Sequence, residues 1–258
     1  MLPRIEINGL PPTVELLSYP ALVNYGHFTA MQVRNGKTRG LRLHLERLDA
    51  AHQELFDVGL DGDQVRDRIR HALGDDVRDA SVRVVVWQSE GDAEASIMVS
   101  VKPPVEVSSR PQALRSVVCQ RPVAHLKHVG AFGLIYHGTR AERDGFDDAL
   151  LTDSGGVISE GTITNIGFFE RGSVVWPDAP ALRGITMQLL EQGLPGVGVP
   201  SIRKSARLRD LGGFDGGFVS NSRGVAPLGR IDNVALPHDP VLFERVAKAY
   251  ESAPWDAI

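Results

Sequence analysis

The stretch Val157-Ile-Ser-Glu-Gly-Thr-Ile-Thr-Asn165 is the most informative in this chain. Glu160 follows a short apolar run and precedes small polar residues, whose backbone can approach a ligand closely. Just upstream, Ala149-Leu-Leu-Thr-Asp153 and a Ser154-Gly-Gly turn predict a β-hairpin that leads into it. A carboxylate here would favour the protonated form of a neighbouring basic nitrogen. Taken alone, Glu160 could equally be a solvated hairpin residue.

Two further segments supply groups that complement this carboxylate. Lys127 lies in His125-Leu-Lys-His-Val-Gly130, where apolar and cationic neighbours favour the neutral amine that forms an imine. Leu182-Arg-Gly-Ile-Thr186 opens an apolar helix, and the free N–H groups of a helix start attract phosphate. Together these groups suit an aldehyde cofactor with a pyridine nitrogen and a phosphate, which is pyridoxal 5′-phosphate. Taken singly, a surface lysine and an ordinary helix cap are the simpler explanations.

Other polar residues extend the expected anion site. Arg47 could add a charged fork to the phosphate, and Asn221 and Ser222 follow a short strand with amide and hydroxyl donors. A solvated arginine and a polar turn are the alternatives. We expect no metal, because the histidines between residues 125 and 137 lack a ligand pattern with carboxylate support.

The composition is that of an ordinary globular chain. Hydrophobic residues make up 42% of the 258 residues and charged residues 23%. A formal net charge of -4 argues against a general nucleic-acid binder. Cys119 is the only cysteine, which excludes an intrachain disulfide and fits a cytoplasmic location. The first residues lack a long apolar core and no stretch approaches a membrane span, so we expect neither signal peptide nor membrane segment.

The pattern of elements predicts an α+β architecture with two domains. Hydrophobic periodicity predicts helices at residues 41–56, 64–73, 184–191 and 240–250. Runs of β-branched residues bounded by turn residues predict strands at 81–87, 95–101, 149–153, 157–159, 166–170, 173–176 and 217–220, with a loop at 90–93. The proline-rich segment 102–111 is the expected linker. We therefore expect a small N-terminal domain at 1–101 and a larger, cofactor-binding domain at 112–258.

From about Tyr25 to Leu228, the order of these blocks resembles the class IV aminotransferases. This family shares fold type IV of the pyridoxal phosphate enzymes and includes branched-chain aminotransferases, D-amino acid aminotransferases and 4-amino-4-deoxychorismate lyases. The interval between Lys127 and Glu160 is similar to that of the family. The resemblance implies a small N-terminal α/β domain, a larger C-terminal domain, a cofactor lying between them, and a homodimer.

The resemblance also implies a role for each matching residue. Lys127 matches the Schiff-base lysine, which would hold the cofactor as an internal aldimine. Glu160 matches the carboxylate at the pyridine nitrogen, and Arg47, in His44-Leu-Glu-Arg-Leu48, matches the phosphate-binding arginine. The remaining cofactor-binding residues implied by the family motifs are Leu182, Ile185, Thr186, Asn221 and Ser222. Phe28, His44 and Arg223 are candidates for substrate contact by charge and motif position.

The implied activity is transfer of an amino group between an amino acid and a 2-oxo acid, with Lys127 as general base and acid. Departures from the family leave the subfamily open: Thr29 replaces a common glutamate, Phe132 occupies the region of a tyrosine, and Met187 stands where an arginine is usual. Gly26-His-Phe-Thr29 and Asn221–Pro227 look closer to the lyases, so release of 4-aminobenzoate and pyruvate from aminodeoxychorismate is the alternative. A non-catalytic binding module is a third reading, which the intact Lys127 opposes.

Overall fold

Two units divide the chain in the computed structural model, which describes residues 4–89 and 91–258. The first unit comprises the residues up to Val105, Leu126–Gly130 and Pro254–Ile258; the second comprises Glu106–His125 and Ala131–Ala253. The chain thus passes between units inside the expected linker and returns twice. Residues 1–3, at the start of the segment examined for a signal peptide, and residue 90, in the expected loop, lie outside the described residues.

The first unit is built on a four-stranded antiparallel sheet. Its strands, in spatial order, are β1 (Arg4–Ile7), β5 (Ser96–Lys102), β4 (Ala80–Trp87) and β2 (His27–Val33). Burial alternates along β2, because successive side chains of a strand point to opposite faces. A second, two-stranded sheet joins β3 (Lys37–Arg39) to β15 (Trp255–Ala257), so the end of the chain belongs to this unit.

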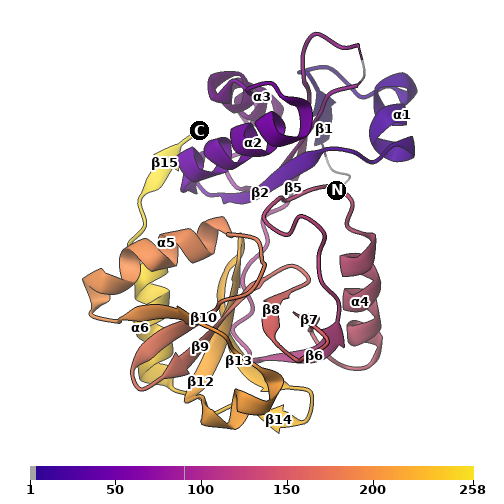
Figure 1. Ribbon diagram of the computed structural model, residues 1–258. Coiled ribbons are helices and arrows are strands. Elements are labelled where there is room, and N and C mark those ends of the chain that lie inside the picture. The colour runs from indigo at the N-terminus through magenta and orange to yellow at the C-terminus, as the bar shows by residue number, and fades with distance from the viewer. Residues whose placement is uncertain (1–3, 90) are drawn as a thin grey trace. The chain divides into compact units, whose positions relative to one another are not determined.

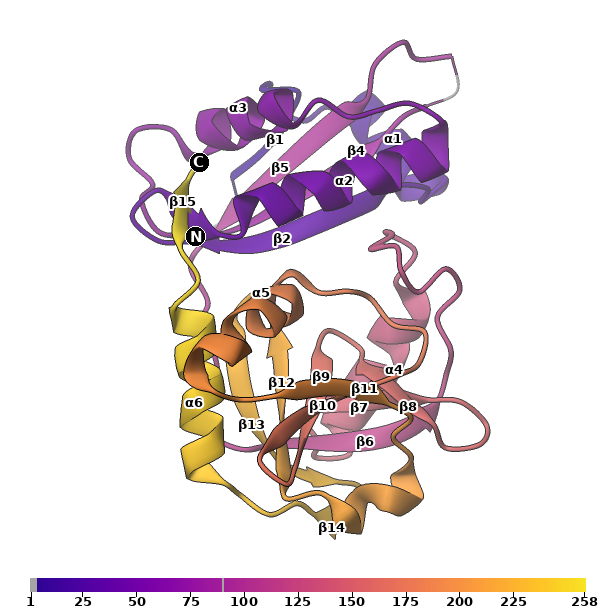
Figure 2. The ribbon, with the colours of Figure 1, turned by 60° about the vertical axis from the view of Figure 1, so that its left-hand side comes forward.

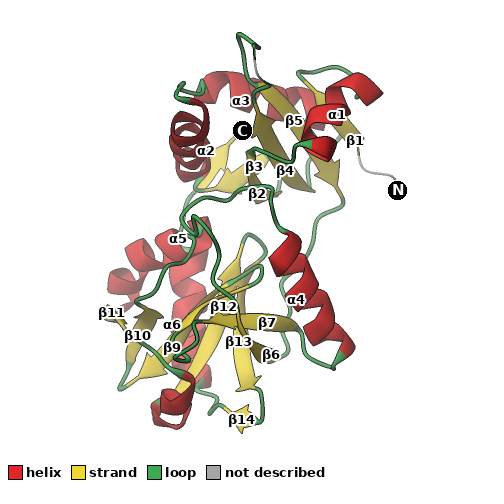
Figure 3. Ribbon diagram, turned by 45° about the vertical axis from the view of Figure 1, so that its right-hand side comes forward, coloured by secondary structure: helices red, strands yellow, loops and turns green. Residues whose placement is uncertain are grey.

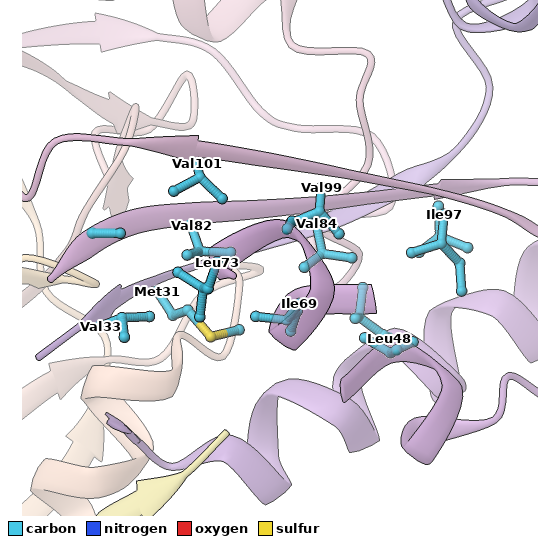
Figure 4. Close-up of a cluster of buried hydrophobic side chains, with 14 of the residues drawn as sticks. Met31, Val33, Leu48, Ile69, Leu73, Val82, Val84, Ile97, Val99 and Val101 are labelled. Atoms are coloured by element: carbon cyan, nitrogen blue, oxygen red, sulfur yellow. The ribbon is translucent and has the colours of Figure 1, made fainter. Parts of the chain in front are cut away.

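Two amphipathic helices cover one face of this sheet, as Figure 2 shows. They are α2 (Leu41–Phe56) and α3 (Gly62–Leu73), and both confirm the periodicity of the sequence. Leu48 and Ile69 from the helices meet Val84 and Val99 from the strands in one buried cluster (Figure 4). Burying such side chains stabilises the unit by about 1.5–3 kcal/mol each.

Helix α1 (Val14–Leu22) was not expected from the sequence. None of its residues is buried, and it contains Pro20, so it shows neither the apolar stripe nor the composition of a typical surface helix. The hydroxyl of its N-cap residue Thr13 accepts a hydrogen bond from the N–H of Leu16 (3.2 Å), which explains where the helix begins.

The second unit is built on a larger mixed sheet. In spatial order its strands are β11 (Ser201–Lys204), β10 (Ser173–Pro177), β9 (Asn165–Glu170), β12 (Gly216–Asn221), β13 (Gly224–Ile231), β6 (Gln112–Val118), β7 (Asp148–Thr152) and β8 (Ile158–Gly161), with β14 (Val234–Ala235) beside β13. The pairs β10/β11, β13/β6 and β6/β7 are parallel. The expected hairpins β7/β8 and β9/β10 are confirmed.

This sheet buries apolar side chains on both faces. Phe218 and Val219, neighbours on β12, belong to different hydrophobic clusters, as the alternation of a strand requires. Two helices, α5 (Ile185–Gly193) and α6 (Pro240–Glu251), pack on the Phe218 face (Figure 1). The 3-10 turns Leu194–Val197 and Leu208–Gly213 complete the unit. The α+β class expected from the sequence is confirmed.

Helix α4 (Phe132–Arg143) lies beside β6 and β7, as seen in Figure 3. Of its residues only Ala141 is buried, while Phe132, Ile135 and Tyr136 are exposed. Its apolar side chains therefore do not mark a core-facing stripe, which is why the periodicity of the sequence did not predict it. Among the described residues, no helix is long and apolar enough to cross a membrane.

Candidate active site

Lys127 is held by backbone pairing within the first unit. The N–H of Phe28 donates to the carbonyl of Lys127 and the N–H of Val129 donates to the carbonyl of Gly26, both at 2.9 Å. The loop around Lys127 thus forms an isolated antiparallel bridge, His27 to His128, at the edge strand β2. The side-chain Nζ of Lys127 lies 4.8 Å from the centroid of the Phe28 ring, so the ring is one element that positions the amine.

Arg83 is a second cation at the same ring. Its guanidinium carbon lies 3.8 Å from the ring centroid of Phe28. Register explains this contact, because Arg83 on β4 pairs with Ala30, two residues from Phe28 on β2. Partial burial lowers the pKa of Arg83, but the guanidinium stays charged. No motif marks this residue in the sequence, although a lone cation in the apolar strand Ser81–Trp87 is a signal.

Arg47 sits on the helix-facing side of β2 in a hydrogen-bonded group. Its Nη2 donates to the hydroxyl of Thr29, which also lies 2.6 Å from Nδ1 of His44. Desolvation lowers the pKa of Arg47 to about 10. Burial, and then the cations Arg47 and Lys127, hold the pKa of His44 well below its usual range, so His44 is neutral. Nε of Arg47 is buried without a hydrogen-bond partner among the described residues, and none of their carboxylates forms an ion pair with Arg47.

His27 and His52 extend this group below the lysine loop. Nε2 of His27 lies 3.2 Å from Nδ1 of His52, and both side chains are buried. Desolvation, His52 and Arg47, in that order, lower the pKa of His27 to about 3. The pair is therefore uncharged at neutral pH and adds no positive charge beside Arg47.

Glu160 is clamped within the second unit. Its Oε1 accepts a hydrogen bond from Nη1 of Arg121 (2.8 Å), and its Oε2 accepts one from the N–H of Leu182 (3.2 Å). Both side chains of the ion pair are buried. Glu160 is thus no solvated hairpin residue. Arg121 was not identified from the sequence.

The start of α5 is a buried group of free donors. The carbonyl of Leu182 accepts hydrogen bonds from Nδ2 of Asn165 (2.7 Å) and the N–H of Gly184 (3.0 Å), which fixes the approach to the helix. The N-cap Gly184 gives no side-chain cap, and Ile185 and Thr186 are buried. The free N–H groups of a buried helix start without capping partners form a binding site for an anion.

The end of β12 lies against this helix start. The hydroxyl of Thr186 donates to the carbonyl of Asn221 (2.6 Å), so this hydroxyl is engaged with the backbone, and the N–H of Thr186 in the first turn of α5 is the donor left for an anion. The hydroxyl of Ser220 is buried without a partner among the described residues. Ser220, Asn221 and Arg223 also line a cavity of about 100 Å³ within the second unit. Ser222 follows Asn221 in the turn between β12 and β13.

Known proteins are similar in the sequence and fold that carry the residues described in the two units. The family model of amino-transferase class IV matches residues 26–231. The chain belongs to the class IV aminotransferases. Membership confirms the family resemblance, the fold type, the enzyme class and the pyridoxal 5′-phosphate cofactor that the ordered sequence blocks predicted.

Individual relatives of this class IV aminotransferase are distant. A protein of Methanocaldococcus jannaschii, assigned as a branched-chain-amino-acid aminotransferase, is 25% identical over 88% of this chain and 86% of its own length. A hypothetical aminotransferase from Mycobacterium tuberculosis in its PLP-bound form has a TM-score of 0.84 at 19% identity, covering 96% and 98% of the two chains.

Two further structures show the range of the fold. A form of a hypothetical aminotransferase from Mycobacterium tuberculosis with α-ketoglutarate and PMP has a TM-score of 0.80 at 20% identity, covering 91% of this chain and 90% of that one. A protein of Legionella pneumophila assigned as a 4-amino-4-deoxychorismate lyase has a TM-score of 0.81 at 20% identity, covering 91% and 93%. At such identities the likeness concerns the fold alone.

The residues of this class IV aminotransferase fit the cofactor of its family. In the first unit, a buried nitrogen and an uncompensated charge on Arg47 suit a phosphate dianion. In the second unit, the uncapped start of α5 and the orphaned hydroxyl of Ser220 are further anion donors. The first unit brings together Phe28, His44, Arg47 and Lys127; the second holds Glu160, Leu182, Ile185, Thr186, Asn221, Ser222 and Arg223.

Proposed function

We propose that this enzyme transfers the amino group of an apolar, branched-chain type amino acid to a 2-oxo acid that carries a second carboxylate. The assignment of the Methanocaldococcus jannaschii relative supports the first substrate. The α-ketoglutarate in a structural relative supports the second. The single observation that carries the proposal is the pair of cations, Lys127 and Arg83, over the ring of Phe28.

Each predicted residue has a role in this proposal. Arg47 of the first unit is a proposed phosphate donor, since its Nε is buried with unused capacity. In the second unit the N–H groups of Ile185 and Thr186 are proposed phosphate donors, with Asn221 and Ser222 at the end of β12. Leu182 packs on the cofactor ring, and its N–H fixes the carboxylate of Glu160.

Proton transfer falls to Lys127. When bound, pyridoxal phosphate supplies an electron-poor ring that stabilises negative charge at the substrate α-carbon. The amine of Lys127 takes the proton from the α-carbon as general base and returns it to the C4′ carbon of the cofactor as general acid. Glu160 holds a proton on the ring nitrogen, and the lowered pKa of His44 makes it a weak base.

In this proposal Arg83 binds the second carboxylate of the substrate, the one that glutamate has and leucine lacks. It lies at the ring against which the Lys127 amine is held, and its guanidinium can bind a carboxylate by two parallel hydrogen bonds. Phe28 provides the apolar floor between the two cations. His44, which is buried and bonded to Thr29, is less suited to that role than the sequence implied. Arg223, exposed at the rim of the cavity of the second unit, is the other candidate.

A half-reaction screen tests the substrate class. The purified enzyme, loaded with pyridoxal phosphate, is mixed with single L- and D-amino acids without an acceptor, and the loss of its visible absorbance is followed. We expect L-leucine, L-valine and L-glutamate to react. Arg83→Gln should slow the half-reaction with glutamate by about tenfold or more and leave the rate with leucine unchanged. An equal decrease in the rates with glutamate and leucine would contradict the role of Arg83.

A lyase is the second candidate. The segment Asn221–Pro227 and the fold likeness to the Legionella pneumophila protein favour it. Its mark is release of pyruvate and 4-aminobenzoate from aminodeoxychorismate without any amino acceptor. An enzyme that gives these products and reacts with none of the amino acids would replace our first proposal.

The exposed apolar face of α4 supports a homodimer. Phe132 is 81% exposed, Ile135 66% and Tyr136 47%. Exposed patches of this kind mark interfaces. Ile135→Glu should lower the molar mass measured by light scattering from that of a pair to that of a single chain, whereas Val241→Glu, at the exposed start of α6, should not. A cytoplasmic location stays our proposal and is supported by the lone cysteine.

A further inference from the structure

Arg121 forms a buried ion pair with the carboxylate of Glu160. The two side chains are only 8% and 6% exposed, and their nearest atoms lie 2.8 Å apart. The pair Arg115–Asp144 in the same unit, by contrast, is 46% and 40% exposed. A charge pair removed from water is stabilising only with close geometry and further hydrogen bonds, so the burial of Arg121 and Glu160 points to a purpose other than stability.

The geometry fixes both ends of this pair. Arg121 holds one oxygen of Glu160, and the N–H of Leu182 holds the other. The same Nη1 of Arg121 donates to the carbonyl of Ala124 (2.9 Å). The preceding residue, Val123, has a left-handed backbone conformation (φ 42). The arginine is therefore anchored to a tight turn while it points at the carboxylate, and Glu160 can neither rotate nor withdraw freely.

Without a cation, burial would favour the neutral form of this glutamate. Desolvation disfavours a charged carboxyl, whereas a nearby cation and N–H donors favour it. A proton shared between Glu160 and a ring nitrogen would then rest on whichever group is more basic. A cation as close as Arg121 makes a carboxylate a weaker base, which favours the proton on the ring nitrogen.

We propose that Arg121 is a positioning residue that keeps Glu160 ionised and oriented, and thereby keeps the ring nitrogen of the cofactor protonated. The inference rests on the proposed function, because it takes Glu160 as the partner of that nitrogen. It adds to that function the residue that sets how strongly the ring withdraws electrons.

The test uses pyridoxal 5′-phosphate labelled with ¹⁵N in its ring, bound to the full-length enzyme. The ¹⁵N chemical shift reports directly whether the nitrogen carries a proton, and it requires no substrate. In the wild type we expect the shift of a protonated ring. In Arg121→Gln we expect it to move toward that of neutral pyridine, with a half-reaction about tenfold slower or more. Arg115→Gln, which removes the exposed pair, is the matched control and should change neither.

Non-additivity identifies the path of the effect. If Arg121 acts through Glu160, Arg121→Gln should change the half-reaction by less than about twofold in a Glu160→Gln background. If Arg121→Gln does not fold, Arg121→Met, which also removes the charge, decides: displacement of the ¹⁵N signal toward that of neutral pyridine supports the proposal. A signal at the wild-type position in either folded variant overturns it. Absence of any bound ¹⁵N signal in the wild type would instead refute the proposed function, and this inference with it.

Discussion

Phe28 and Lys127 are joined by a backbone hydrogen bond, in which the N–H of Phe28 donates to the carbonyl of Lys127 at 2.9 Å. The lysine therefore belongs to the first unit in space, although it follows Glu106–His125 of the second unit in sequence. A loop that is paired like a strand holds its side chain more rigidly than a free loop does. The amine that we propose as reactive gains its position from β2, and Arg47, the proposed phosphate ligand of the same unit, donates to Thr29 on that strand.

Loss of the Lys127 amine should abolish proton transfer. We expect Lys127→Ala to slow the half-reaction by about a thousandfold or more, because it removes the amine that we propose as the general base. The backbone pairing should survive, since it uses no side-chain atom. The measurement is stopped-flow absorbance, with borohydride labelling of the lysine peptide. Lys102→Ala, at the exposed end of β5, is the control and should retain both rate and label. A labelled peptide in Lys127→Ala would refute the assignment.

Thr29 should matter for cofactor affinity through Arg47. Thr29→Val keeps the shape but removes the hydroxyl that accepts from Arg47 and bonds His44. Leaving these buried groups unpaired should lower the free energy of unfolding by about 1–3 kcal/mol. We also expect about tenfold weaker binding of pyridoxal phosphate, since the guanidinium loses its orientation.

Denaturant unfolding of the apoprotein and a cofactor titration measure these two effects. Thr29→Ser, which keeps the hydroxyl, is the matched variant and should stay close to the wild type in both. If the valine and serine variants behave alike, the hydroxyl has no such role.

Local periodicity and ordered motifs account for what the sequence revealed. The helix at 41–56 was predictable because its apolar residues recur on one buried face, while α4 was not because its apolar residues face outward. Lys127 and Glu160 stand in characteristic segments. Arg121 carries no such signal, since its partner is 39 positions away and only folding brings the two together.

The hydrogen bond from Asn165 to the carbonyl of Leu182, at the start of α5, should be broken by a side chain added at Gly184. A Cβ at Gly184 would lie 2.1 Å from Oδ1 of Asn165, although the backbone at this glycine has an ordinary φ of -63. Gly184→Ala therefore displaces Asn165 from the carbonyl of Leu182, and we expect a loss of about 1–3 kcal/mol in the free energy of unfolding.

The matched control is Gly196→Ala, where nothing lies within 4 Å of the added carbon. It should change the free energy of unfolding by less than about 0.5 kcal/mol. Because the helix start is also a proposed phosphate site, Gly184→Ala should weaken cofactor binding and Gly196→Ala should not. Equal behaviour of the two variants would show that the Asn165 hydrogen bond contributes little.

Acid should destabilise the first unit through its buried histidines. The pKa of His27 falls from 6.5 to about 3 in the folded protein, chiefly by desolvation. Between these values the unfolded chain binds a proton that the folded chain does not, so stability falls as the pH drops below about 6.5 and is unaffected above it. The slope is about 1.4 kcal/mol per pH unit for one such histidine.

Urea unfolding from about pH 7 down to pH 5, above the range where most carboxylates titrate, measures the summed contribution of His27, His44 and His52, whose pKa values are all lowered. His27→Gln should flatten the dependence by up to about 1.4 kcal/mol per pH unit, because glutamine binds no proton in either state. His238→Gln, an exposed histidine of the second unit, should leave the slope as it is. A wild-type slope in His27→Gln would mean that His27 ionises as readily in the folded protein as in the unfolded one, and that its contact with His52 is not the neutral pair described above.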